Sequence, residues 1–184
     1  MRTLLEALAD LKIPTEALTF TTGNTLDLNR VMQQTGLDVC QLRERYGRLS
    51  NLEIGLIKQF NEPVKVAMSR LPNLNGTGLT PLGEAMQIAA SRLIVRPETR
   101  LILLVLTDGK AGCEGGALSA AVHAQEMAMR ITKAGIELIG VGILDENIRE
   151  IVREAMVIQQ IEELPAQLCK LLSRTLQKGL RHVG

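Results

Sequence analysis

The amino-acid sequence predicts an α/β fold in which a mainly parallel sheet is flanked by helices. The first observation is the segment Leu101–Lys110, in which an apolar run ends on Asp108 and Gly109. A short continuous apolar run is typical of a strand that is covered on both faces. The second observation is that apolar runs at 136–143 and 156–161 alternate with helical patterns, which is the order of βαβ units.

The composition indicates one globular domain. A chain of 184 residues with 46% hydrophobic content is long enough to bury a core that is stable unaided. The 21 basic and 20 acidic residues are spread along the sequence, which argues against a nucleic-acid footprint. Only 2% of residues are aromatic, so base-stacking platforms are not expected and the core is predicted to be aliphatic.

Cysteine usage and hydropathy predict a cytoplasmic protein. Cys40, Cys113 and Cys169 are far apart and odd in number, which is typical of reduced thiols. No apolar run reaches the length of a membrane span, and the first residues contain Glu6 and Asp10 where a signal peptide has an apolar centre.

The amino-terminal part predicts a helix that leads into a strand. Four leucines recur at helical spacing before Pro14, and residues 17–22 have strand composition. Residues 23–50 are polar and weakly periodic, so we expect a surface insertion with one short helix near 29–34. The four leucines are Leu4, Leu5, Leu8 and Leu11.

The sequence patterns in the middle of the chain predict secondary structure less clearly. Residues 52–60 fit either a strand or a helix, and 63–71 fit a helix that begins at its proline. The pair Thr80-Pro81 is typical of a cap and first turn, which predicts a helix continuing to about Val95.

Helical patterns separate the later strands. Residues 117–134 predict a long helix ended by Gly135, and 145–153 predict a short one. Residues 165–180 predict a terminal amphipathic helix. Its inner face is expected to carry Leu168, Leu171, Leu172 and Leu176.

Two oxygen-bearing side chains are the candidate site. Asp108 ends a predicted strand, and the ligand crevice of open α/β sheets lies outside the carboxyl ends of the strands. Thr80 stands at the mouth of a predicted helix, and a hydroxyl with a carboxylate suits Mg²⁺. The simpler alternatives are that Asp108 only makes a turn and that Thr80 is only an N-cap. A phosphate-binding loop is not expected, because no Gly-Lys-Ser/Thr follows the glycines.

Three ordered segments carry a resemblance to a known family. Residues 78–85 (GLTPLGEA), 103–109 (LLVLTDG) and 135–143 (GIELIGVGI) resemble those of von Willebrand factor type A (VWA) domains. Residues 18–22 and 162–165 are also similar to the VWA domain at the end of the cobalt-chelatase accessory subunit (CobT-like) and its phage relatives. The resemblance covers nearly the whole chain and implies a three-layer α/β fold.

The resemblance also implies a partial metal-ion-dependent adhesion site. Such a site combines an Asp-x-Ser-x-Ser strand end with a threonine and an aspartate, which by resemblance are Thr80 and Asp108. The Asp-x-Ser-x-Ser motif is absent from this sequence. We therefore expect an N-terminally truncated domain over 1–184 that lacks the first central strand and binds Mg²⁺ weakly or not at all.

A missing central strand has a structural consequence. The strands containing Phe20 and Asp108 would flank it and would present unpaired backbone groups to each other. Three alternatives stay open: the strands close on each other, take a strand from a second chain through self-association, or remain partly disordered.

The resemblance implies a protein-interaction module accessory to a chelatase-type AAA+ ATPase that inserts cobalt during cobalamin biosynthesis. The alternative is a metal-independent assembly domain in which Thr80 and Asp108 are relics. A third, remote class is a hydrolase dependent on Cys113, although no base for it is identifiable. No catalytic residue, nucleic-acid partner or membrane partner is assigned. His123 and His182 are expected to be surface or packing residues, and Met86, Met127 and Met129 to be core filler.

Overall fold

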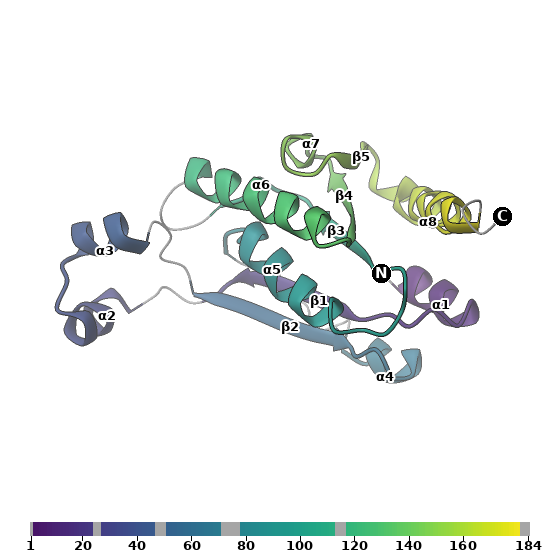
Figure 1. The fold of residues 1–184 in the computed structure, drawn as a ribbon, viewed down its shortest axis with the longest axis horizontal. Helices are drawn as coiled ribbons and strands as arrows, with labels where there is room; N and C mark the ends of the chain where they lie inside the picture. The colour runs from purple at the N-terminus through teal and green to yellow at the C-terminus, as the bar shows by residue number, and fades with distance from the viewer. Residues whose placement is uncertain (1, 24–26, 47–50, 71–77, 113–116, 181–184) are drawn as a thin grey trace.

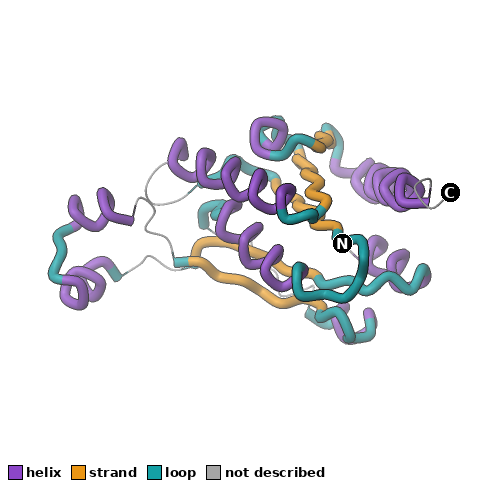
Figure 2. Tube along the Cα trace, viewed as in Figure 1, coloured by secondary structure: helices purple, strands orange, loops and turns teal. Residues whose placement is uncertain are grey.

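The computed structural model describes residues 2–23, 27–46, 51–70, 78–112 and 117–180. Within these segments helices alternate with strands along most of the chain (Figures 1 and 2). The elements are α1 (Arg2–Asp10), β1 (Ala17–Thr22), α2 (Leu28–Thr35), α3 (Val39–Tyr46), β2 (Leu52–Lys58), α4 (Val64–Met68), α5 (Leu82–Leu93), β3 (Ile102–Thr107), α6 (Ala117–Lys133), β4 (Glu137–Ile143), α7 (Ile148–Ile151), β5 (Glu154–Ile158), the 3-10 turn η2 (Ile161–Glu163) and α8 (Leu164–Leu180).

The strands form two separate sheets. β3, β4 and β5 are parallel in the order β3-β4-β5, with Ile102 opposite Glu137. β1 and β2 form an antiparallel pair in which Phe20 is opposite Ile54. The α/β fold class predicted from the sequence is therefore confirmed, and the parallel part is the three-stranded sheet.

Glycines allow β4 to lie unusually close to α7. A Cβ atom at Gly142 would lie 2.1 Å from the backbone carbonyl oxygen of Asp145, and one at Gly140 would lie 2.6 Å from Ile148 Cγ1. Both distances are shorter than real Cβ contacts, so a larger residue would push the helix away from the strand. The glycines thus fix the packing of the segment that connects β4 to β5.

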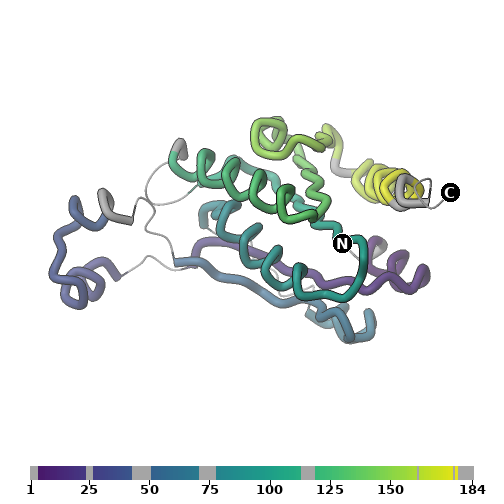
Figure 3. The backbone as a smooth tube through the Cα atoms, in the orientation of Figure 1, coloured from purple at the N-terminus to yellow at the C-terminus, as the bar shows by residue number. Residues whose placement is uncertain are grey.

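Helices cover the parallel sheet on both faces. One core lies beneath α5, α6 and α7, and a second lies beneath α1 and α8. The first and last helices described, α1 and α8, lie in contact with each other (Figure 3). Buried members of the first core include Met86, Val105, Ala124 and Ile148, and those of the second are Leu4, Leu8, Val141, Ile158 and Leu168.

The insertion at 23–50 contains two helices instead of the single helix predicted near 29–34. Figure 1 shows α2 and α3 at one end of the molecule, away from both sheets. Asp27 caps α2 by accepting a hydrogen bond from the Arg30 backbone nitrogen. The second helix begins with a reciprocal pair, because Asp38 and Gln41 each accept a hydrogen bond from the other's backbone nitrogen. This Asp-x-x-Gln capping box is the sequence signal that the prediction missed.

Several boundaries and burial predictions were wrong. α1 ends at Asp10 and Lys12 has a φ of 56°, so Leu11, which continues the helical spacing of the leucines, lies beyond the helix and is exposed. Met129 is also exposed, whereas the other two predicted filler methionines are buried. The last strand begins at Glu154, two residues before the predicted start. The ambiguous segment at 52–60 is a strand, and the side chain of Leu176 lies outside the described residues.

The remaining elements agree with the sequence. The predicted helices at 63–71, 117–134, 145–153 and 165–180 correspond to α4, α6, α7 and α8. The φ of Gly135 is 86°, as expected of a glycine that ends a helix. None of the helices in the described segments is both long and apolar enough to cross a membrane.

Candidate functional site

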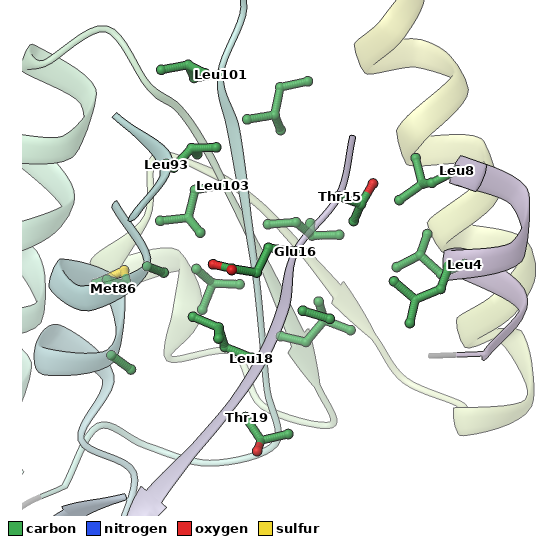
Figure 4. Close-up of a pocket in the computed structure, with 18 of the residues that line it drawn as sticks. Leu4, Leu8, Thr15, Glu16, Leu18, Thr19, Met86, Leu93, Leu101 and Leu103 are labelled. Atoms are coloured by element: carbon green, nitrogen blue, oxygen red, sulfur yellow. The ribbon is translucent and has the colours of Figure 1, made fainter. Parts of the chain in front are cut away.

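A cavity of about 470 Å³ lies between β1 and β3, one strand from each sheet (Figure 4). Every residue from Ala17 to Phe20 and from Leu101 to Asp108 borders it. Successive residues of a strand point to opposite faces, so a lining that includes all of them means that the edge of each strand faces the cavity. The cavity is therefore a gap in the plane of the two sheets.

The two residues predicted to bind metal stand at one rim of this cavity. Thr80 is half-buried and Asp108 is exposed, and both contribute to the lining. The residue after Asp108 lies against Thr80, because a Cβ atom at Gly109 would be 3.6 Å from Thr80 Oγ1. The loop that follows β3 is held to the same place, since the Gly112 backbone nitrogen donates to the Thr80 carbonyl oxygen at 2.9 Å.

Thr80 does not cap the following helix with its side chain. The cap position of α5 is Pro81, and that position has no side-chain hydrogen bond. The simpler interpretation of Thr80 as a plain N-cap is therefore wrong. The hydroxyl borders the cavity next to the loop that carries Asp108.

Thr22 positions the rim, although its role was not predicted from the sequence. Its hydroxyl oxygen accepts a hydrogen bond of 2.6 Å from the Leu79 backbone nitrogen, and its own nitrogen donates to the Leu79 carbonyl oxygen. A glycine is required beside it, because Gly78 has a φ of 95° and a Cβ there would lie 2.4 Å from the Thr22 carbonyl oxygen. The pattern Gly78-Leu79-Thr80 therefore docks onto the end of β1.

A closed metal site is not assembled from the described residues. No group of three or more histidine, cysteine, aspartate or glutamate side chains in those segments is placed to hold an ion. One hydroxyl and one carboxylate leave most of the positions around Mg²⁺ to water. Asp145, another acid beyond a strand end, already accepts a hydrogen bond from the Asn147 backbone nitrogen at 3.2 Å. The donor set at the rim therefore fits the ion only in part.

The opposite end of the cavity carries paired charges. Glu16 accepts two hydrogen bonds of 2.7 Å from Arg92, which raise the pKa of that guanidinium. Glu98 accepts from Arg96, and this bond lowers the pKa of the Glu98 carboxyl. Arg100 donates to Glu137 and to a backbone carbonyl of α8. Charged side chains thus border the two ends of the cavity, whereas its length is lined mainly by apolar residues.

Lys58 is a buried lysine with a structural role. Its ammonium group donates 2.9 Å hydrogen bonds to the carbonyl oxygens of Thr15 and Gln59. Burial lowers the pKa of Lys58, and the nearby Glu62 and Glu16 partly oppose this shift. These contacts fasten the end of β2 to the loop before β1, at a distance from the rim formed by Thr80.

The histidines and cysteines considered in the sequence do not form a site in the described residues. His123 is nearly buried, with Nδ1 3.5 Å from Glu84 Oε1 and close to Gly83, which fits the predicted packing role. Cys113 and His182 lie outside the described residues. The thiols of Cys40 and Cys169 are free and exposed.

Comparison with known proteins identifies a family. Residues 1–178 match the family described as the VWA domain of the cobalamin biosynthesis protein CobT. The match spans both sheets, the Thr80 rim and most of α8. No curated protein and no solved structure shows significant similarity to the chain.

Proposed function

The chain belongs to the CobT VWA-domain family, and we propose that it is a protein-interaction module that binds its partner at the Thr80 and Asp108 rim. The observation that supports this proposal is the exposed carboxylate of Asp108 near the Thr80 hydroxyl, which does not cap the following helix. An exposed acid and a hydroxyl at the carboxyl edge of a parallel sheet are well placed to contact a ligand.

The partner that we propose is a chelatase-type AAA+ ATPase ring, with cobalt insertion in cobalamin biosynthesis as the process served. This step follows from the family to which the chain belongs. In this proposal Mg²⁺ at the rim is held by Thr80 Oγ1 and the Asp108 carboxylate, and the ion accepts an acidic side chain from the partner. Because only two protein oxygens contribute, the domain alone binds the ion weakly.

The second candidate function is a metal-independent assembly domain. It is favoured by the same donor count, because no cluster of three ligating side chains exists among the described residues. In that case Thr80 and Asp108 contact the partner directly through hydrogen bonds. A hydrolase dependent on Cys113 stays a remote alternative, which a Cys113→Ser variant tests by loss of turnover on generic esters.

A binding assay separates these functions. The full chain is immobilised and titrated with the AAA+ subunit of the same organism, in Mg²⁺ and in EDTA. We expect Asp108→Asn to weaken binding at least about tenfold, whereas Asp10→Asn, an exposed acid at the end of α1, leaves it unchanged.

The two conditions distinguish the metal-dependent function from the alternative. Binding that is lost in EDTA supports the metal-assisted function, and binding that survives EDTA but not Asp108→Asn supports the assembly domain. Equal binding by the wild type and Asp108→Asn contradicts both. Calorimetry with Mg²⁺ alone tests whether the domain binds the ion weakly. Tight, stoichiometric binding that is lost in the Thr80→Ala variant would refute this expectation.

A further inference from the structure

The backbone of Leu144 has a conformation that leucine rarely adopts. Its φ is 60°, in the left-handed region that glycine and asparagine enter at little cost and that a larger side chain disfavours. The residue directly follows β4, at the carboxyl edge of the parallel sheet. Strained residues of this kind cluster at binding and catalytic sites, so a leucine at this position needs a physical reason.

The turn itself does not need the side chain of Leu144. The Leu144 backbone nitrogen donates to the Ile158 carbonyl oxygen at 2.9 Å, which fastens the turn to the end of β5. Gly142 leaves room for the carbonyl of Asp145, whose carboxylate accepts a hydrogen bond from the Asn147 backbone nitrogen. All of these contacts are made by groups other than the leucine side chain, so glycine or asparagine would form the same turn.

The core does not need this side chain either. Leu144 is 64% exposed, and it belongs to none of the three apolar clusters among the described residues. Neither the turn nor the core therefore explains a leucine here, and most of its apolar surface is accessible to another molecule.

Leu144 lies at the same edge of the sheet as the Thr80 and Asp108 rim. Thr107 of β3 is paired with Gly142 of the neighbouring parallel strand β4. Asp108 stands one residue beyond Thr107, and Leu144 stands two residues beyond Gly142. Because neighbouring strands are about 4.8 Å apart, the two segments leave the sheet side by side. One partner surface can therefore contact both.

The charged side chains of the same turn are paired with each other. Glu146 forms an ion pair of 2.7 Å with Arg149 and accepts a hydrogen bond of 3.1 Å from Gln159, which follows β5. These groups therefore require no charge from a partner. Leu144 is an apolar surface with neutralised polar side chains beside it, which resembles the apolar centre and polar rim of a protein interface.

We propose that Leu144 is an apolar contact of the partner interface and that its strained backbone is retained for this contact. It packs against an aliphatic or aromatic side chain of the AAA+ partner, close to the acidic side chain by which that partner reaches the Thr80 and Asp108 rim. A partner with a charged side chain at this place would bury the charge against leucine, so Leu144 also selects against it. The inference rests on the proposed function, because one partner supplies both side chains.

The immobilised-chain binding assay, applied to Leu144→Asn, tests the inference. Asparagine adopts the left-handed conformation readily but lacks the apolar side chain. We expect Leu144→Asn to weaken binding of the AAA+ subunit at least about fivefold. We also expect it to raise the midpoint of thermal unfolding by about 2–4 °C, because the strain is relieved. Leu144→Met, which keeps an apolar side chain, is expected to retain most of the binding.

Leu11→Asn is the matched control. Leu11 is 63% exposed, nearly the same fraction as Leu144, but its φ is not in the left-handed region. It precedes β1, whereas the rim lies at the carboxyl end of that strand, where Thr22 is bonded to Leu79. We therefore expect Leu11→Asn neither to weaken binding nor to raise the thermal midpoint.

Asp108→Asn, measured in parallel, separates this inference from the proposed function. If Asp108→Asn weakens binding and Leu144→Asn does not, the inference is overturned and the proposed function stands. If only Leu144→Asn weakens binding, the function of the rim is overturned and the apolar contact is supported. Unchanged binding in both variants, or no binding by the wild type, overturns both. A thermal midpoint that falls in Leu144→Asn would show that the leucine stabilises the fold, which also overturns the inference.

Discussion

The parallel sheet and the antiparallel pair differ in how completely their strands are enclosed. β4 is paired on both edges, and five of its seven residues are buried. β1 is paired only with β2 among the described strands, and only its first and last residues are buried. The stability of the three-stranded sheet is therefore contained within its own βαβ units. The two-stranded sheet depends on the helices that pack against it, α4 on β2 and α5 on β1.

Truncating one core residue in each sheet is expected to show the largest difference. Ile139 of β4 is 2% exposed, so Ile139→Ala is expected to lower the free energy of unfolding by about 2–5 kcal/mol. Ile57 of β2 packs in a smaller cluster with Ala67, which can collapse around the lost atoms. Ile57→Ala is therefore expected to cost nearer about 2 kcal/mol. Urea unfolding followed by circular dichroism measures both, and equal losses would mean that the sheets are equally well packed.

Adding one methyl group to a strand glycine sharpens the comparison. Gly142→Ala sets a Cβ against the backbone of Asp145, so we expect a loss of about 1–3 kcal/mol. Gly55→Ala sets a Cβ 2.4 Å from Thr19 Oγ1, a side-chain atom that can rotate away. We expect Gly55→Ala to cost under about 1 kcal/mol. Thermal melts decide the point, and a larger shift for Gly55→Ala would contradict the rigid packing of β4 on α7.

Removing an arginine is expected to destabilise the protein more at the three-stranded sheet than at the two-stranded sheet, with smaller losses than those above. Arg100 joins β3 to Glu137 of β4 and to the Thr175 carbonyl of α8, so Arg100→Ala is expected to cost about 1 kcal/mol. Arg92 pairs with Glu16 before β1, but its side chain is 44% exposed. Arg92→Ala is expected to cost about 0.5 kcal/mol. Raising the salt concentration should reduce the Arg92 effect more, and the reverse result would show that the exposed pair is the stronger one.

The sequence predicted the parallel half well because its signals are local. Local sequence patterns are enough to predict its elements: the apolar run before Asp108, the helix that ends at Gly135 and the apolar run of β4. The prediction was less successful for segments whose structure depends on contacts with other parts of the chain. Whether 52–60 is a strand depends on pairing with β1, and the end of α1 at Asp10 goes with the turn at Lys12.

The candidate site was predicted only as residues beyond strand and helix ends. Thr80 and Asp108 were named from the sequence, and the structure brings both to one rim. Their role as metal ligands stays a prediction. The contribution of Thr22 was not predictable, because its bond to Leu79 joins residues 57 positions apart. The open gap between the sheets was not predicted: the strands were expected to close on each other, to take a strand from a second chain or to remain partly disordered, whereas β1 and β3 are formed and lie in separate sheets.

Lowering the pH is expected to destabilise the fold by weakening the pair of Glu62 and Arg70, which lies beside the two-stranded sheet. Glu62 accepts two 2.7 Å hydrogen bonds from Arg70, which also donates to the Ile57 carbonyl oxygen of β2. The hydrogen bonds from Arg70, followed by that from the Gln59 backbone, lower the pKa of the Glu62 carboxyl below its ordinary value of 4.5. The carboxylate therefore binds its proton less readily in the folded than in the unfolded chain.

The sign of the pH dependence follows from that lowered pKa. The contribution of Glu62 is complete above about pH 4.5 and is lost as the pH falls through the folded-state pKa. The wild type is thus expected to be more stable than Glu62→Gln at pH 7, and the difference is expected to shrink below about pH 4.5. Urea midpoints of both proteins across this range measure it, with Glu163→Gln, an exposed acid at the end of η2, as the control. Because the partner Arg70 is 39% exposed, solvent screens the pair and the effect is small. A difference that stays constant with pH would show that proton binding at Glu62 is not linked to folding.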